Sequence, residues 1–285
     1  MFGRVVDYWL LRPFVHGRNR ATEEELNRRA ETPEAFDREK SVQRLGKIRD
    51  RLRGGFPIQA GLRYLDVGCG DGEIARAMAL CGATDVTGMD IVERCIRQAQ
   101  IRAREAGLGT RCRFLVQDIL AYHPSKPYDV VLSTEALEHI AEPGQFLKSL
   151  SSLVAPGGLV VLDFGPLFHS ICGDHMGGFF NILIPWRGVL FSEQAILQLR
   201  REFFRPTDPA ERFQDIVGGL NRKRYSEFLH YIRDAGLAVQ SLIINSQLCK
   251  VPPLYWCSEI LRRIPIVRNY VVISVYAILR RCGKD

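Results

Sequence analysis

Apolar runs alternate with amphipathic segments through the central part of the chain. The apolar runs predict short strands at residues 63–67, 85–89, 112–117, 128–133 and 159–164. The amphipathic segments between them predict helices at residues 72–80, 92–106 and 145–154. Strands that alternate with helices form βαβ units, so we expect an α/β fold with a mainly parallel, doubly wound sheet.

The pattern differs before this region. Thr22 opens a capping-box sequence, and Thr32-Pro33 places a proline at a first helical position. These signals predict helices across residues 22–52. We therefore expect an N-terminal helical lid over residues 1–57, followed by one α/β domain over residues 58–285.

The pattern also breaks after the fifth predicted strand. Residues 165–223 are rich in Phe, Trp, His and Gly and have no regular period, although Ser192 could cap a helix at 193–203. The rhythm then resumes with a predicted helix at 225–235 and late strands at 239–244 and 270–279. A long insertion in an α/β domain usually carries specificity, so we interpret residues 165–223 as a substrate cap.

Composition and charge narrow the class of protein. The 285 residues are 46% hydrophobic and 25% charged, with a net charge of +7 spread among interleaved acids and bases. The eight cysteines form no C-x-x-C pair, which favours reduced thiols in a cytoplasmic setting. The longest uncharged apolar run near the end, residues 270–279, is half of the ~20 residues that a spanning helix needs. We therefore expect no transmembrane segment and no secretory signal.

A glycine turn follows the first predicted strand, in the sequence Asp66-Val-Gly68-Cys-Gly70-Asp-Gly72. No Lys-Ser or Lys-Thr follows Gly72, which argues against a P-loop. The glycine spacing differs from the G-x-G-x-x-G of dinucleotide sites, and the carboxylate of Asp66 would repel a pyrophosphate. The turn favours a ligand that presents a cation or a hydrogen-bond donor to Asp66.

Five segments in order carry a resemblance to a known family. They are LDVGCGDG (65–72), VTGMDI (86–91), FLVQDI (114–119), YDVVLSTEALEHI (128–140) and LVAPGGLVVLDF (153–164). Together they resemble the motifs of class I S-adenosylmethionine-dependent methyltransferases, over roughly residues 60–165. The resemblance implies a Rossmann-like, seven-stranded, mostly parallel sheet with helices on both faces.

The same resemblance implies a methyl transfer from S-adenosylmethionine to a small-molecule acceptor, most simply to an oxygen. Transfer to nitrogen or carbon of a small or lipid-like acceptor stays open, as does a non-catalytic cofactor-binding module. The glycine spacing argues against a nicotinamide oxidoreductase. The absence of an N-P-P-[YF] motif and of a dense basic-aromatic patch argues against a nucleic-acid substrate.

The resemblance places the cofactor at the carboxyl ends of the strands. Asp66 would hold the methionine end, Asp90 would accept both ribose hydroxyls, and Asp118 would accept the adenine amino group. Seven more residues complete the predicted cofactor site: Gly68, Cys69, Gly70, Ile91, Gln117, Ile119 and Ser133.

Two further clusters could act on the acceptor. His169 and His175 have side chains suited to a general base near neutral pH, and Asp174 could orient one of them or could stabilise a glycine-rich loop. The Glu135, Glu138 and His139 cluster resembles that of ubiquinone-pathway O-methyltransferases, in which the matching residues are associated with a divalent metal. We favour structural packing for this cluster and expect no metal. Trp9, Tyr255 and Trp256 leave peripheral membrane contact open, and the oligomeric state is not predicted.

Overall fold

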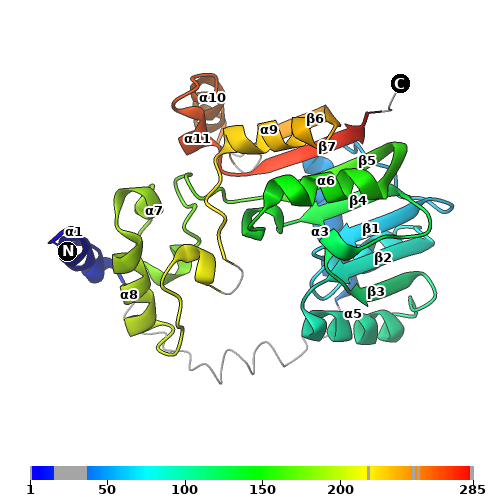
Figure 1. Ribbon diagram of the computed structural model, residues 1–285, viewed down its shortest axis with the longest axis horizontal. Helices are drawn as coiled ribbons and strands as arrows, with labels where there is room; N and C mark the ends of the chain where they lie inside the picture. The colour runs from blue at the N-terminus through cyan, green and yellow to red at the C-terminus, as the bar shows by residue number, and fades with distance from the viewer. Residues whose placement is uncertain (1, 16–36, 217–218, 246–247, 249–250, 283–285) are drawn as a thin grey trace.

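A seven-stranded sheet forms the centre of the protein in the computed structural model, which describes residues 2–15, 37–216, 219–245, 248 and 251–282. The strand order is β3-β2-β1-β4-β5-β7-β6 (Figure 1). Its strands are β1 (Arg63–Val67), β2 (Asp85–Asp90), β3 (Cys112–Val116), β4 (Tyr128–Thr134), β5 (Val154–Phe164), β6 (Leu237–Ile244) and β7 (Val275–Arg281). The first five strands are parallel, whereas β7 runs antiparallel to both of its neighbours. The predicted Rossmann-like, mostly parallel fold is confirmed.

Helices cover both faces of this sheet. On one face lie α3 (Arg38–Arg51), α4 (Glu73–Leu80) and α5 (Glu93–Glu105), and on the other lie α6 (Pro143–Leu153) and α9 (Tyr225–Asp234). The central strand β4 shows how one sequence serves both faces, because Val131 packs with α6 while Val130 and Leu132 pack toward α4. Such a strand reads as a continuous apolar run rather than an alternating one.

A smaller cluster of helices forms the cap beside the sheet, and the first helix of the chain belongs to it (Figure 1). The cap contains α1 (Phe2–Leu11), α7 (Arg187–Leu190) and α8 (Glu193–Phe203). Leu11 of α1 is buried together with Phe180 and Ile196 of the cap. The structure therefore separates the described parts of the predicted N-terminal lid, since α3 packs against α4 on the sheet. The predicted helix starts at Thr22 and Thr32 lie outside the described residues.

The remaining elements are short. Helices α10 (Pro252–Leu261) and α11 (Arg268–Val271) connect β6 to β7, so the start of the predicted strand at 270–279 is a helical turn and β7 begins at Val275. Five 3₁₀ turns complete the described chain: η1 (Arg12–Phe14), η2 (Ile119–Ala121), η3 (Leu137–His139), η4 (Gly177–Phe179) and η5 (Phe213–Asp215).

Candidate functional site

The glycine turn between β1 and α4 makes a close approach to the neighbouring strand. The backbone N–H groups of Gly68 and Cys69 both donate to the carbonyl oxygen of Met89, at 2.9 and 3.0 Å. Gly70 has a φ of +53°, and a side chain there would meet no protein atom within 4 Å. Gly72, with a φ of +77°, has the Phe114 ring 2.4 Å from where a Cβ would lie. The turn is therefore packed on the Gly72 side and open at Gly70.

Asp66 lies beneath this turn as a buried carboxyl group with unmet hydrogen-bonding capacity. Its side chain is 1% exposed, and neither carboxylate oxygen has a hydrogen-bond partner among the described residues. Burial raises the pKa of Asp66 to about 7, although the nearby N–H of Ala75 and the charge of Arg44 act in the opposite direction. The Oγ of Ser133, at the end of the adjacent β4, is also buried without a partner there. Unpaired buried polar groups are uncommon in folded proteins, and a bound ligand is one way to satisfy them.

Asp90 occupies the end of β2, where its carboxylate is held by two backbone amides. Oδ2 accepts from the N–H of Gly70 and Oδ1 from that of Val92, each at 2.9 Å. A carboxylate has about four acceptor positions, so each oxygen can still accept a hydroxyl. Ile91 beside it is 71% exposed and offers an apolar surface. Asp90 can therefore accept further hydrogen bonds beside an apolar surface.

The next predicted contacts follow β3. Asp118 caps η2, with Oδ1 accepting from the N–H of Leu120 at 2.9 Å, and Gln117 donates to the carbonyl of Asp118 at 3.2 Å. Ile119 is buried in the main core, so its side chain serves packing. Cys69 is half-buried, and burial raises the pKa of its thiol, which keeps the group protonated. Strands β3, β2, β1 and β4 are neighbours in the sheet, so the predicted cofactor residues gather at the carboxyl ends of these four strands. We call this end of the sheet the cofactor edge.

Arg44 of α3 lies beside the candidate site and was not predicted from the sequence. Its guanidinium pairs with Glu73 in the first turn of α4 and with Glu135 after β4, the latter at 2.6 Å. It therefore links three segments around the glycine turn, and its positive charge acts on Asp66. A single arginine in a polar helix carries no sequence signal for this position, because the contact partners lie 29 and 91 residues away.

The side chains of Glu135, Glu138 and His139 do not converge on one point. Glu135 has a φ of +51° and lies before the 3₁₀ turn η3, so it does not share a helix face with Glu138. Glu138 is buried and accepts from the N–H of Gly165 at 3.1 Å, while its second oxygen has no partner among the described residues. Within the described part of the chain, no group of three or more His, Cys, Asp or Glu side chains is arranged to hold a metal ion.

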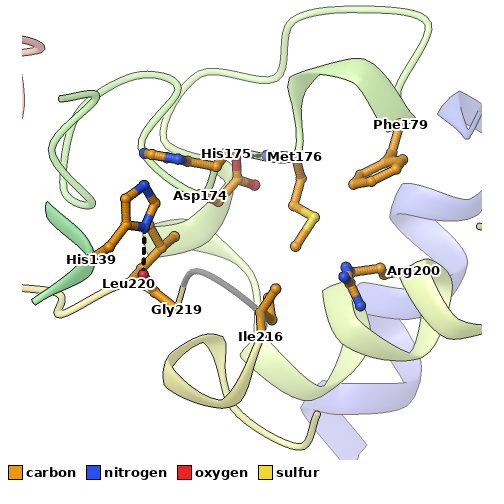
Figure 2. Close-up of a pocket in the computed structure, with 9 residues that line it drawn as sticks. All are labelled: His139, Asp174, His175, Met176, Phe179, Arg200, Ile216, Gly219 and Leu220. Atoms are coloured by element: carbon orange, nitrogen blue, oxygen red, sulfur yellow. Dashed lines mark hydrogen bonds between the residues drawn. The ribbon is translucent and has the colours of Figure 1, made fainter. Parts of the chain in front are cut away.

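A cavity of about 200 Å³ lies between η3 and the cap. Figure 2 shows the imidazoles of His139 and His175 at one end and Phe179 and Arg200 at the other. The ring centroids of the two histidines are 5.5 Å apart, with the planes nearly perpendicular. Met176, Ile216 and Leu220 add apolar walls. The cavity can therefore accept a small, partly apolar molecule beside two imidazoles.

Asp174 does not orient either histidine in this structure. Its two carboxylate oxygens accept from Nε and Nη2 of Arg187, at 2.7 and 2.9 Å, and one of them also accepts from the N–H of Met176. Both partners of this ion pair are almost fully buried. The guanidinium of Arg187 also lies 3.8 Å from the centroid of the Phe180 ring. Asp174 therefore holds the cap together, as the alternative loop-stabilising interpretation expected.

Hydrogen bonds determine which nitrogen of each histidine is basic. His139 Nδ1 lies 2.7 Å from the carbonyl oxygen of Gly219, and His175 Nε2 lies 2.8 Å from that of Pro166. A carbonyl can only accept, so these nitrogens carry the protons and the free lone pairs are on His139 Nε2 and His175 Nδ1. Burial lowers the pKa of His175, which favours its neutral form.

His169 lies apart from the cavity-lining residues. Its Nε2 is 3.0 Å from the carbonyl oxygen of Arg222, and its Nδ1 is buried without a partner among the described residues. Burial lowers the pKa of His169 as well. The structure thus brings His175 next to His139, for which the sequence analysis favoured structural packing over a role as a metal ligand.

The fold of the sheet is shared with solved S-adenosylmethionine-dependent methyltransferases. Residues 58–175 match the family model of a methyltransferase domain, over the same β strands that carry Asp66, Asp90 and Ser133. A solved S-adenosylmethionine-dependent methyltransferase from Mesorhizobium loti has the same fold, with a TM-score of 0.54 and 20% identity over 81% of this chain and 96% of that chain.

Several curated proteins that are similar to this chain are ubiquinone biosynthesis O-methyltransferases. That of Maricaulis maris (strain MCS10) is 42% identical over 123 residues, which cover 41% of this chain and 48% of the relative. That of Caulobacter sp. (strain K31) is 40% identical over 120 residues, covering 42% and 47%. The chain thus spans about half the length of the curated relatives it matches.

Proposed function

We propose that this protein transfers a methyl group from S-adenosylmethionine to an oxygen atom of a small-molecule acceptor. The observation that carries the proposal is the buried carboxyl group of Asp66, which lacks a hydrogen-bond partner under a glycine turn that is open at Gly70. The similarity to ubiquinone biosynthesis O-methyltransferases supports oxygen as the acceptor atom.

The described residues fit this cofactor. Asp66 would accept from the ammonium group of the methionine end, and the free lone pairs of Asp90 would accept from the ribose hydroxyls. Ile91 would lie against the adenine, and Asp118 would accept from the adenine amino group. When bound, the cofactor supplies an electrophilic methyl group on a sulfonium. Arg44, which connects α3 to both sides of the turn, would close this site.

The cavity between η3 and the cap would hold the acceptor. Its apolar walls exclude water from part of the acceptor, while His139 Nε2 presents a free lone pair. We assign His139 as the general base that takes the hydroxyl proton, because η3 directly follows β4, whose end forms part of the cofactor edge. The neutral His175 would then position the acceptor through its Nδ1.

Two measurements test this function in sequence. Titration calorimetry with S-adenosylmethionine should show binding that Asp66→Asn weakens, and NADH should not bind. Transfer of labelled methyl from the cofactor should then be screened over phenols, carboxylic acids and sugar hydroxyls, with amines as a comparison. Turnover on amines alone would contradict O-methylation, and cofactor binding without any turnover would favour a binding module.

A further inference from the structure

The connection between β6 and β7 exposes an unusual number of large apolar side chains. Helices α10 and α11 extend from the end of the sheet, next to the cap (Figure 1). We call the exposed apolar residues of this connection the α10 surface. Its members are Val251, Leu254, Trp256, Ile260, Leu261, Ile264 and Ile266. Ile266 is 81% exposed and Trp256 is 64% exposed, so these side chains contribute little to the core.

The pattern of buried and exposed residues in α10 is opposite to that of an ordinary surface helix. Ser258 is its one buried residue, whereas Leu254, Trp256 and Ile260 point outward. A surface helix normally buries its apolar stripe and exposes polar residues. A helix that exposes tryptophan and isoleucine while it buries a serine is suited to an apolar environment on its outer side.

Charge on the same segment is positive. Residues 251–271 contain one acid, Glu259, and three arginines, Arg262, Arg263 and Arg268. The carboxylate of Glu259 accepts from Arg262 at 2.6 Å, so the acid is neutralised locally. Arg263 is exposed at the end of the apolar helix. Basic residues that flank exposed apolar side chains complement anionic lipid headgroups.

The dimensions favour contact in the plane of a membrane. No helix in the described residues is long and apolar enough to cross a bilayer, and α10 has 10 residues. The aromatic pair Tyr255 and Trp256 has side chains that prefer the boundary between headgroups and acyl chains. Helices that lie at this boundary bury apolar side chains near the acyl chains and keep basic side chains at the headgroups.

We propose that the α10 surface docks this protein on anionic lipid membranes. Contacts in the structure connect this surface to the acceptor cap, because Trp186 at the start of α7 donates from Nε1 to the carbonyl of Tyr270 in α11, at 2.9 Å. Docking there holds the cap, with its cavity residues Asp174 and His175, close to the bilayer. The proposal is independent of methyl transfer.

Sedimentation of the full-length chain with lipid vesicles tests the proposal. Vesicles of phosphatidylcholine with about one third phosphatidylglycerol provide the anionic surface, and pure phosphatidylcholine vesicles provide the neutral one. We expect binding to the anionic vesicles that weakens with salt. The triple variant Trp256→Ser, Ile260→Ser, Ile266→Ser should lose at least about tenfold in vesicle affinity, because it removes three apolar groups from the boundary. Arg263→Glu should weaken binding to anionic vesicles selectively.

Ile101→Ser is the matched control, since Ile101 is 46% exposed on α5, far from α10 in Figure 1. It should leave vesicle binding unchanged. All replaced residues are exposed, so the thermal unfolding temperature and the cofactor affinity of the variants should match those of the wild type. A loss of vesicle binding with unchanged cofactor affinity would then concern membrane docking and not the proposed methyl transfer. Wild-type protein that ignores both vesicles, or a triple variant that binds as well as wild type, would overturn the proposal. Light scattering that shows a dimer dispersed by the triple variant, without vesicle binding, would assign the surface to a second copy of the chain.

Discussion

The cofactor edge and the cap are built by different physical means. At the cofactor edge, the candidate residues lie at the ends of adjacent parallel strands, and backbone N–H groups hold their side chains, as where Gly70 donates to the carboxylate of Asp90. In the cap, segments far apart in the chain are held together by side-chain packing, as where Leu11 of α1 is buried together with Phe180 and Ile196. The comparison indicates that the proposed cofactor site depends on backbone geometry at the ends of adjacent strands, whereas the proposed acceptor cavity depends on packing between segments far apart in the chain.

Removal of the proposed base should have the largest effect, and it should lower catalysis without changing cofactor binding. We expect His139→Ala to lower kcat by about 10²–10⁴-fold, because a positioned general base contributes that much to proton transfer. The dissociation constant for S-adenosylmethionine should stay within about twofold, since His139 lies on the cap side of η3. Steady-state kinetics and calorimetry provide the two numbers. His169→Ala is the control. An equal loss of kcat in this variant would contradict the assignment of His139 as the general base.

Breaking the buried ion pair should damage the cap while sparing the cofactor edge. Asp174→Ala leaves the Arg187 guanidinium buried without its carboxylate, which costs about 3–5 kcal/mol of stability. We expect an early thermal transition for the cap and a cofactor affinity that persists below that transition. Scanning calorimetry with and without S-adenosylmethionine measures both. A single cooperative transition that abolishes cofactor binding would show that the two regions fold as one unit.

Changing the buried carboxyl should affect the cofactor edge alone. Asp66→Asn removes the charged acceptor for the ammonium group, and loss of a charge-assisted hydrogen bond corresponds to about 10- to 100-fold in affinity. The same change should raise stability at pH 8, because it removes a buried carboxylate without a partner. Asp90→Ala should weaken cofactor binding as well. Unaltered affinity in both variants would contradict the assigned site.

The pH dependence should distinguish the same regions by a smaller effect. The pKa of Asp66 is about 7 in the folded protein, against an ordinary value of 3.8. Between about pH 4 and pH 7, this carboxyl group is therefore protonated in the folded state and ionised in the unfolded chain. The stability that this group contributes is present below pH 4 and is lost as the pH rises to 7. Asp163, whose pKa burial also raises to about 7, acts in the same direction.

Cofactor affinity should follow the opposite course. Because the ammonium group requires the ionised Asp66, affinity should fall by up to about tenfold for each pH unit below 7. Binding near neutral pH should also release a proton, which calorimetry in buffers of different ionisation enthalpy detects. In Asp66→Asn both the slope and the proton release should disappear. A proton release that survives this substitution would assign the titration to another group.

The predicted strands and turns agree closely with the structure because their signals are local. Predicted strand 63–67 is β1, and predicted helix 193–203 is α8. The positions of Asp66 and Asp90 follow from a carboxylate at the end of each strand, since parallel neighbours bring their carboxyl ends together. Arg44 could not be placed in this way, because its role depends on how α3 crosses the turn.

The acceptor side required the tertiary structure. Sequence proximity suggested that Asp174 acts on His175, yet a left-handed backbone at His175, with a φ of +56°, turns its ring away toward Pro166. Asp174 is instead used by Arg187, 13 residues later. His139 precedes His175 by 36 residues, yet the two ring centroids are 5.5 Å apart, because both imidazoles line the same cavity.

By itself, the sequence determined the doubly wound sheet and the glycine turn with the acid that precedes it, and these features led to the proposed methyl donor. These features are encoded in short stretches, where glycine conformation and strand adjacency leave few alternatives. The tertiary structure alone decided which histidines share the acceptor cavity and that α1 joins the cap. It also decided that α10 directs Trp256 and Ile260 outward. Those outcomes depend on contacts between residues far apart in the chain, and a local pattern of side chains contains no information on such distances.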